Sequence, residues 1–96
     1  MDSEIIKISD MYLAAAILSY GATLVEIDRS DPKRLKFCFQ DDIKTAYCLA
    51  KYGTPQTVSD PTIQDVEAMF ISKTLMFPPQ YPESVRSIKA AIYSHD

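Results

Sequence analysis

The longest stretch of hydrophobic positions predicts a helix over residues 11–20. Alanine and leucine dominate this stretch, Ser9 or Asp10 can cap its start, and Gly21 follows directly where a left-handed residue ends many helices. Only serine and tyrosine hydroxyls interrupt its apolar surface. Because a helix that is apolar nearly all round must be buried on more than one face, we expect it at the centre of the fold.

Two segments after this helix predict a β-hairpin. Residues 22–28 are rich in strand-forming side chains, and Asp and Pro in residues 29–33 indicate a turn. Residues 34–40 alternate strictly, which places Leu35, Phe37 and Phe39 on a buried face and Arg34, Lys36, Cys38 and Gln40 on a solvent face. Either residues 4–8 or residues 74–77 could extend the hairpin by a third short strand.

The second half of the chain is expected to hold three further helices joined by loops. Apolar residues at helical spacing predict these helices over residues 42–52, 62–72 and 82–94. Asp41 or Asp42 can cap the first of them and Gly53 can end it. The segment 53–59 then reads as a loop, and Asp60-Pro61 as the start of the next helix.

The expected fold is a small α+β domain that spans residues 1–96. Its order is α-β-β-α-α-α, with the antiparallel hairpin packed against three to four helices. A chain of 96 residues matches one domain of modest size. It has no apolar run near the roughly 18 residues that a membrane span needs, and no signal-peptide pattern. These features favour the cytoplasm, which is that of the host cell if a phage encodes the chain.

The charge balance argues against broad nucleic-acid binding. The chain has ten Lys and Arg residues against 13 Asp and Glu residues, which gives a net charge of −3. It therefore lacks the excess of basic residues that phosphate contacts require. One local basic cluster is a candidate contact for nucleic acid or for an acidic partner, and it consists of Arg29, Lys33, Arg34 and Lys36. Its plainer interpretation is a solvated turn beside an edge strand that lysine protects from aggregation.

The sequence offers no catalytic or metal-binding constellation. The two cysteines, Cys38 and Cys48, have no histidine nearby, and His95 is the only histidine. A zinc site needs more ligands at short spacing, and a nucleophilic thiol needs a base. Glycine is too scarce for a phosphate-binding loop. We therefore expect reduced, inert thiols, no catalytic residues, no cofactor, no metal and no membrane contact.

Tyrosines suggest an interaction surface. Six tyrosines are many for this length, and tyrosine is enriched at interfaces because it combines apolar area with a polar tip. The candidate interface residues are Tyr12, Tyr20, Tyr81 and Tyr93. The alternative interpretation is a half-buried position at the core edge. Two interpretations also remain for Met69, Met76 and Phe77, which could pack in the core or form an adaptable binding surface. The apolar first helix could also bury its surface in a homodimer.

Three motifs carry a resemblance to a known family. They are the run from Lys7 to Leu24, with Tyr12-Leu13-Ala14-Ala15 and Gly21, then Phe37-Cys38-Phe39, and the C-terminal run from Tyr81 to Tyr93 with Ile88-Lys89. Across residues 7–39 and 66–93 the chain resembles short bacterial and bacteriophage proteins known only as a domain of unknown function. The resemblance implies a phage or prophage origin and an intracellular setting, and it supplies no catalytic residues.

These observations together favour binding over catalysis. The leading hypothesis is a non-enzymatic, phage-type accessory protein that binds a protein partner or forms a homodimer. The alternative is a small nucleic-acid-binding module that uses the basic hairpin, and such a contact would weaken steeply with salt.

Overall fold

Helix α1 (Met11–Ser19) forms where the sequence predicts it, and local residues cap both of its ends. The computed structural model describes residues 5–50 and 53–93. The Asp10 carboxylate accepts the backbone N–H groups of Tyr12 and Leu13. At the other end Gly21 has φ +100°, and the N–H of Ala22 donates to the carbonyl of Ile17. This Schellman arrangement satisfies carbonyls that the helix end leaves open.

The predicted hairpin is confirmed, and a third strand completes it. Strands β1 (Ile5–Ile8), β2 (Leu24–Asp28) and β3 (Lys36–Gln40) form an antiparallel sheet in the order β1-β3-β2. Phe39 lies opposite Ile6 and Leu24, and Phe37 lies opposite Ile8 and Ile27, so two apolar rows cross one face of the sheet. Of the two candidates for the third strand, the N-terminal segment takes the place.

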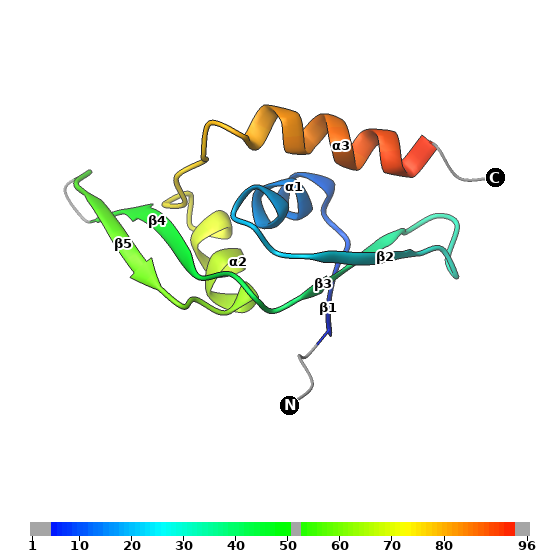
Figure 1. The fold of residues 1–96 in the computed structure, drawn as a ribbon, viewed down its shortest axis with the longest axis horizontal. Coiled ribbons are helices and arrows are strands. Elements are labelled where there is room, and N and C mark those ends of the chain that lie inside the picture. Colours follow the sequence, from blue (N-terminus) through cyan, green and yellow to red (C-terminus); the bar gives the residue numbers. More distant parts are fainter. Residues whose placement is uncertain (1–4, 51–52, 94–96) are drawn as a thin grey trace.

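Helix α1 is the middle layer of the molecule. Figure 1 shows it between α3 (Tyr81–Tyr93) and the three-stranded sheet. Ala14, Ala15 and Ala16 are all 0% exposed, although consecutive helical residues point in directions about 100° apart. The predicted burial on several faces is therefore achieved within one chain. The predicted last helix is also confirmed over its described part, while residues 94–96, with His95, lie outside the described residues.

The prediction that Cys38 lies on a solvent face is wrong. Cys38 is only 1% exposed, although it lies on the side of β3 opposite Phe37 and Phe39. Its register partners on the two neighbouring strands are Lys7 and Glu26, whose long side chains share this face with it. A small side chain on a central strand is readily covered by such neighbours, so alternation alone does not determine exposure.

The helix predicted over residues 42–52 and the loop predicted over residues 53–59 are both wrong. In their place, β4 (Thr45–Leu49) and β5 (Pro55–Ser59) form an antiparallel hairpin. Gly53, expected to end a helix, lies in the turn of this hairpin with φ +78°. Tyr52 lies outside the described residues. The observed order of elements is therefore β-α-β-β-β-β-α-α.

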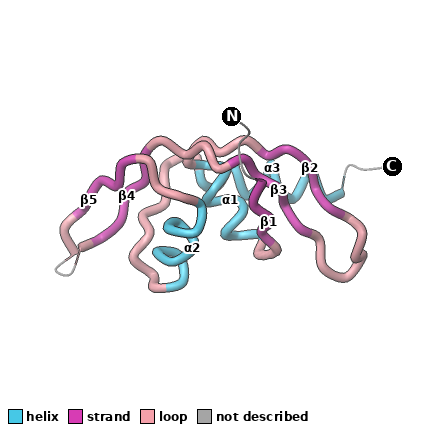
Figure 2. The backbone as a smooth tube through the Cα atoms, turned by 90° about the horizontal axis from the view of Figure 1, so that it is seen from below, coloured by secondary structure: helices cyan, strands magenta, loops and turns pink. Residues whose placement is uncertain are grey.

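Pairing on both sides explains why β4 is extended. One edge of β4 pairs with β5. On the other edge the N–H of Leu49 donates to the carbonyl of Thr74, and the N–H of Met76 donates to the carbonyl of Tyr47. The segment predicted to be extended around residues 74–77 thus pairs with β4 rather than with the first sheet. Figure 2 shows the β4–β5 hairpin at the opposite end of the molecule from the β2–β3 turn.

Helix α2 (Ile63–Ile71) is confirmed close to its predicted bounds. Its cap is Thr62 and not Asp60, and a capping box joins Thr62 to Asp65. The Asp41 carboxylate, 22 residues earlier in the chain, accepts the N–H of Ile63 at 3.0 Å. Asp41 therefore does cap a helix, but not the one that the sequence suggested.

Helix α2 ends at a residue that favours a stabilising substitution. Lys73 follows the helix with φ +64°, and the N–H of Thr74 donates to the carbonyl of Met69. A non-glycine residue is strained in this left-handed conformation. We expect Lys73→Gly to raise the free energy of unfolding by about 0.5–1 kcal/mol in urea titrations. Lys44→Gly, at an exposed position without positive φ, is the control, and equal effects of the two would contradict the expectation.

Candidate functional site

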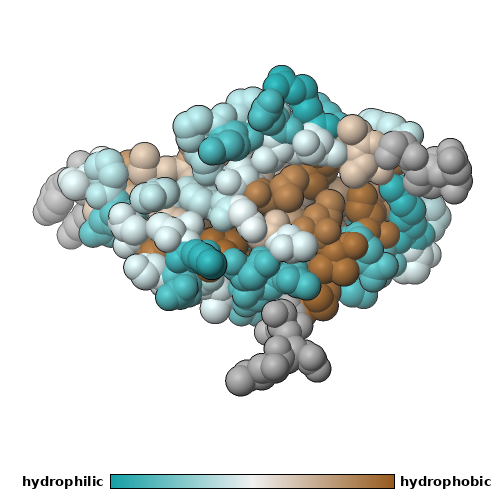
Figure 3. Space-filling view, in the orientation of Figure 1, coloured by the Kyte–Doolittle hydropathy of each residue, from teal (hydrophilic) through white to brown (hydrophobic). Residues whose placement is uncertain are grey.

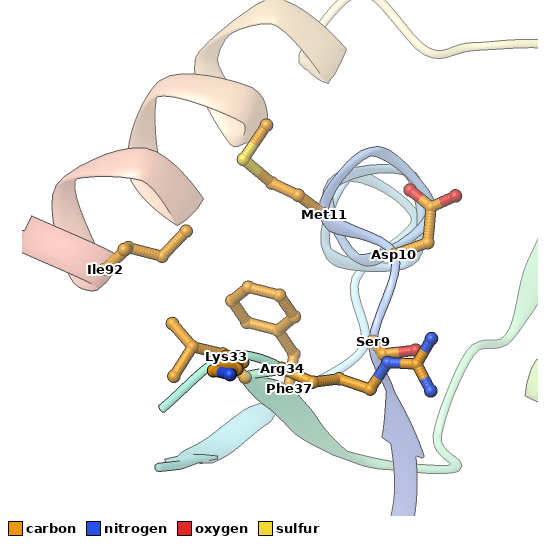
Figure 4. Close-up of a pocket in the computed structure, with 8 residues that line it drawn as sticks. Ser9, Asp10, Met11, Lys33, Arg34, Phe37 and Ile92 are labelled. Atoms are coloured by element: carbon orange, nitrogen blue, oxygen red, sulfur yellow. The ribbon is translucent and has the colours of Figure 1, made fainter. Parts of the chain in front are cut away.

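Two of the four predicted basic residues line a groove beside the β2–β3 turn. We call it the hairpin groove, and it has a volume of about 430 Å³. Its wall is formed by the turn, the start of α1 and the end of α3, through Ser9, Asp10, Met11, Lys33, Arg34, Leu35, Phe37 and Ile92. Figure 4 shows Met11 and Ile92 on either side of the Phe37 ring, with Lys33 and Arg34 on the hairpin side.

The floor of the hairpin groove is apolar. Phe37 is buried, while Met11, Leu35 and Ile92 are each half-buried and leave part of their surface open. In Figure 3 apolar surface gathers on the face between α3 and β1. Half of the residues that line the groove are polar or charged, so this apolar floor lies beside polar groups, a combination that is common in binding sites.

Lys33 and Arg34 carry charges that the described part of the chain does not neutralise. Neither side chain has an ion-pair partner among residues 5–50 and 53–93. The ion pair found in these residues joins Lys7 Nζ to Asp28 Oδ2 at 3.1 Å. The nearby Asp31 carboxylate accepts the backbone N–H of Lys33. Asp10 also lies on the rim, but its carboxylate caps α1 and is turned away from the Phe37 ring in Figure 4.

The other two predicted basic residues have different places. Arg29 donates to the carbonyls of Ala91 at 2.9 Å and Ile92 at 3.4 Å, which are among the last carbonyls of α3. A cation at this end of a helix is favourable because the helix dipole is negative there. Lys36 is exposed, next to Phe37 on β3, and therefore points to the opposite face of the sheet. The four residues do not form one contact surface.

A second hollow continues the hairpin groove around the end of α3. It is lined by Arg29, Pro32, Leu35, Ile92 and Tyr93, and it shares Leu35 and Ile92 with the groove. Tyr93, a predicted interface residue, is 82% exposed at this place. The structure thus brings Tyr93 together with part of the basic cluster, which their distance in the sequence did not reveal.

The other three predicted tyrosines lie away from the hairpin groove. Tyr12 is half-exposed on α1. The Tyr20 hydroxyl lies within hydrogen-bond distance of the carbonyls of Met76 and Tyr47, and thereby ties α1 to β4. The Tyr81 ring lies 4.5 Å from the ring of Phe77, measured between centroids. Burial raises the pKa of both Tyr20 and Tyr81 above the ordinary value for a phenol.

An aromatic groove separates α1 from β4 near these tyrosines. It has a volume of about 350 Å³ and is lined by Tyr20, Tyr47, Met76, Phe77, Pro78, Pro79 and Gln80. Phe77 is 50% exposed, whereas Met76 and Met69 are half-buried. Of Met69, Met76 and Phe77, for which the sequence allowed either a core or a surface position, Phe77 is therefore the exposed residue. None of the described residues that line this groove carries a charge.

The described residues hold no arrangement suited to metal binding. Within residues 5–50 and 53–93, no three side chains of the metal-ligating types lie together. Both cysteines are free thiols, and burial raises the pKa of Cys38 above its ordinary value, which makes the thiolate less available. None of the helices in this part of the chain is long and apolar enough to cross a membrane.

The residues that form the floor of the hairpin groove were not predicted as site residues. Met11, Leu35, Phe37 and Ile92 read in the sequence as core positions of three separate elements, and only their packing makes them neighbours. Comparisons of the chain with protein-family models, curated proteins and solved structures gave no match.

Proposed function

We propose that this chain is a non-enzymatic protein-interaction module that holds its partner in the hairpin groove. The observation that carries the proposal is the coincidence of an open apolar floor with two cations, Lys33 and Arg34, that have no ion-pair partner in the described part of the chain. Apolar area provides affinity at protein interfaces, and charges at the rim provide orientation and specificity.

A protein partner fits this surface better than nucleic acid does. Nucleic-acid affinity grows with the number of phosphates that cations neutralise. The hairpin groove offers two cations that have no ion-pair partner in the described part of the chain, because Arg29 is bonded to α3 carbonyls and Lys36 points to the other face. The net charge of −3 opposes a polyanion as well.

The setting and the assembly of the module belong to the same proposal. A phage or prophage origin and action in the host cytoplasm rest on the family resemblance of residues 7–39 and 66–93. Self-association no longer finds support in α1, because its alanine faces are covered within the chain. A homodimer would instead use exposed side chains such as Tyr93 and Tyr12.

Site-specific photocrosslinking tests the proposal. A photoreactive phenylalanine analogue replaces Tyr93, in the hollow that continues the hairpin groove, or Thr57 on β5, at the other end of the molecule, in the cells that naturally contain the protein. We expect a discrete, nuclease-resistant protein adduct from position 93 and none from position 57. Equal adducts from both positions, no adduct from either, or an adduct that nuclease removes would overturn the proposal.

A further inference from the structure

We infer that the hairpin groove takes an acidic peptide segment of the partner that also carries a bulky apolar side chain. This inference rests on the proposed protein-interaction function and names the chemistry of the segment that binds. Charge complementarity supports the acidic part, and the shape of the groove floor supports the apolar part.

The charges favour carboxylates over other groups. Lys33 and Arg34 are exposed neighbours, and no described acidic side chain pairs with either of them. Two carboxylates are close to them, because Asp10 lines the groove and Asp31 precedes Lys33 by two residues, and both accept backbone N–H groups instead of pairing with these cations. On a chain with a net charge of −3, Lys33 and Arg34 are two adjacent cations without an ion-pair partner in the described residues, and they favour acidic segments over basic ones.

The floor accommodates an apolar anchor. Met11 and Ile92 flank the Phe37 ring (Figure 4). Leu35 lines both this groove and the neighbouring hollow, so it continues the apolar surface between them. The volume of about 430 Å³ falls in the range of roughly 300–1,000 Å³ that is common for binding pockets. Methionine adapts its shape to different side chains, so the floor can accept leucine, methionine or phenylalanine.

The same floor disfavours a nucleic acid strand. Single-stranded nucleic acids bind through bases stacked on exposed rings together with cations that follow the backbone. The ring inside the groove, Phe37, is only 2% exposed and offers no stacking face, and the exposed ring of Tyr93 lies in the neighbouring hollow and not in the groove. Phosphates would also have to lie against Met11 and Ile92, which provide no hydrogen-bond donor from their side chains.

Fluorescence anisotropy with defined probes tests the inference. The main probe is a labelled peptide that carries a Leu-Phe pair between runs of glutamate. Two control peptides replace either the glutamates by lysine or the Leu-Phe pair by serine, and a labelled oligothymidine is the nucleic-acid probe. We expect the main probe to bind at least about tenfold more tightly than either control peptide or the oligothymidine.

Variants of the protein locate the binding. Lys33→Glu with Arg34→Glu should weaken the main probe at least about tenfold. Lys44→Glu with Lys73→Glu changes the net charge equally at exposed positions elsewhere and should leave binding within about twofold. Ile92→Ser should weaken binding of the main probe because it removes apolar area from the groove floor without changing the charge. Thermal unfolding of each variant verifies the fold, and Lys33→Gln with Arg34→Gln replaces the charge reversal if that variant does not fold.

Several outcomes would overturn the inference. They are equal binding of the glutamate and lysine peptides, equal losses in the two charge-reversed variants, and tighter binding of oligothymidine than of the peptide. If no peptide binds while position 93 still gives a protein adduct in cells, the proposed function stands and the acidic chemistry of the segment is wrong. If the adduct is also missing, both proposals fail.

Discussion

Replacing Phe39 with alanine is expected to lower the free energy of unfolding by about 3–5 kcal/mol, as measured by urea titration. Phe39 is fully buried on the central strand β3, between Ile6 of β1 and Leu24 of β2. Its ring is part of the core that α1 covers, so alanine would leave a cavity between the helix and the sheet. A loss of this size is a large part of the 5–15 kcal/mol that stabilises a typical domain.

The matched control for Phe39 lies on the same strand. Lys36→Ala removes an exposed side chain from β3 and should change stability by no more than about 0.5 kcal/mol. If Phe39→Ala does not fold, Phe39→Leu should still fold, with a loss of about 1–2 kcal/mol. A loss below about 1 kcal/mol for the alanine variant would show that Phe39 is not packed as the structure describes.

The double substitution Asp41→Ala with Asp42→Ala is expected to cost about 2 kcal/mol of stability. The two adjacent carboxylates hold different parts of the chain. Asp41 accepts the N–H of Ile63 at the start of α2, while Asp42 accepts the N–H of Thr23 at 3.1 Å and its hydroxyl at 2.9 Å. Their removal leaves a helix-terminal donor and a loop before β2 without these partners.

Charge-matched and shape-matched variants separate the bonds from general electrostatics. Glu26→Ala with Asp31→Ala removes the same charge from exposed positions, with the loss of one turn bond from the N–H of Lys33 to Asp31, and should cost less than about 1 kcal/mol. Asp41→Asn with Asp42→Asn retains an acceptor oxygen at each position and should keep more of the stability than the alanine pair does. Equal losses in the Asp41/Asp42 and the Glu26/Asp31 alanine pairs would contradict the assignment of these bonds.

The proposed binding site in the hairpin groove is built from residues that look structural one by one. Phe37 follows the strand pattern, Ile92 the helix pattern, and Met11 the start of another helix. The turn of the hairpin places Lys33 and Arg34 beside them, and within residues 5–50 and 53–93 neither cation has an ion-pair partner. The proposed site is therefore defined by where these residues pack and by the unpaired charges of Lys33 and Arg34 in the described residues, and not by residue type alone.

Local signals in the sequence were sufficient for the elements that carry their own boundaries. Asp10 and Gly21 enclose α1, and the alternation around Phe37 marks β3, whereas α2 was predicted close to its bounds with Asp60 in place of Thr62 as its cap. Capping bonds, turn geometry and the burial of one face are made within a few residues, so their physical causes can be read from neighbouring positions. The α+β class follows from these elements.

Long-range contacts decided the rest. Residues 45–49 have apolar spacing that also suits a helix, and their backbone is extended because β5 and the segment around Leu75 pair with its two edges. Cys38 is buried because of two strands that precede β3 in the chain, and Arg29 is bonded because α3 ends beside it. Each outcome depends on partners distant in sequence, whose positions exist only once the chain has packed.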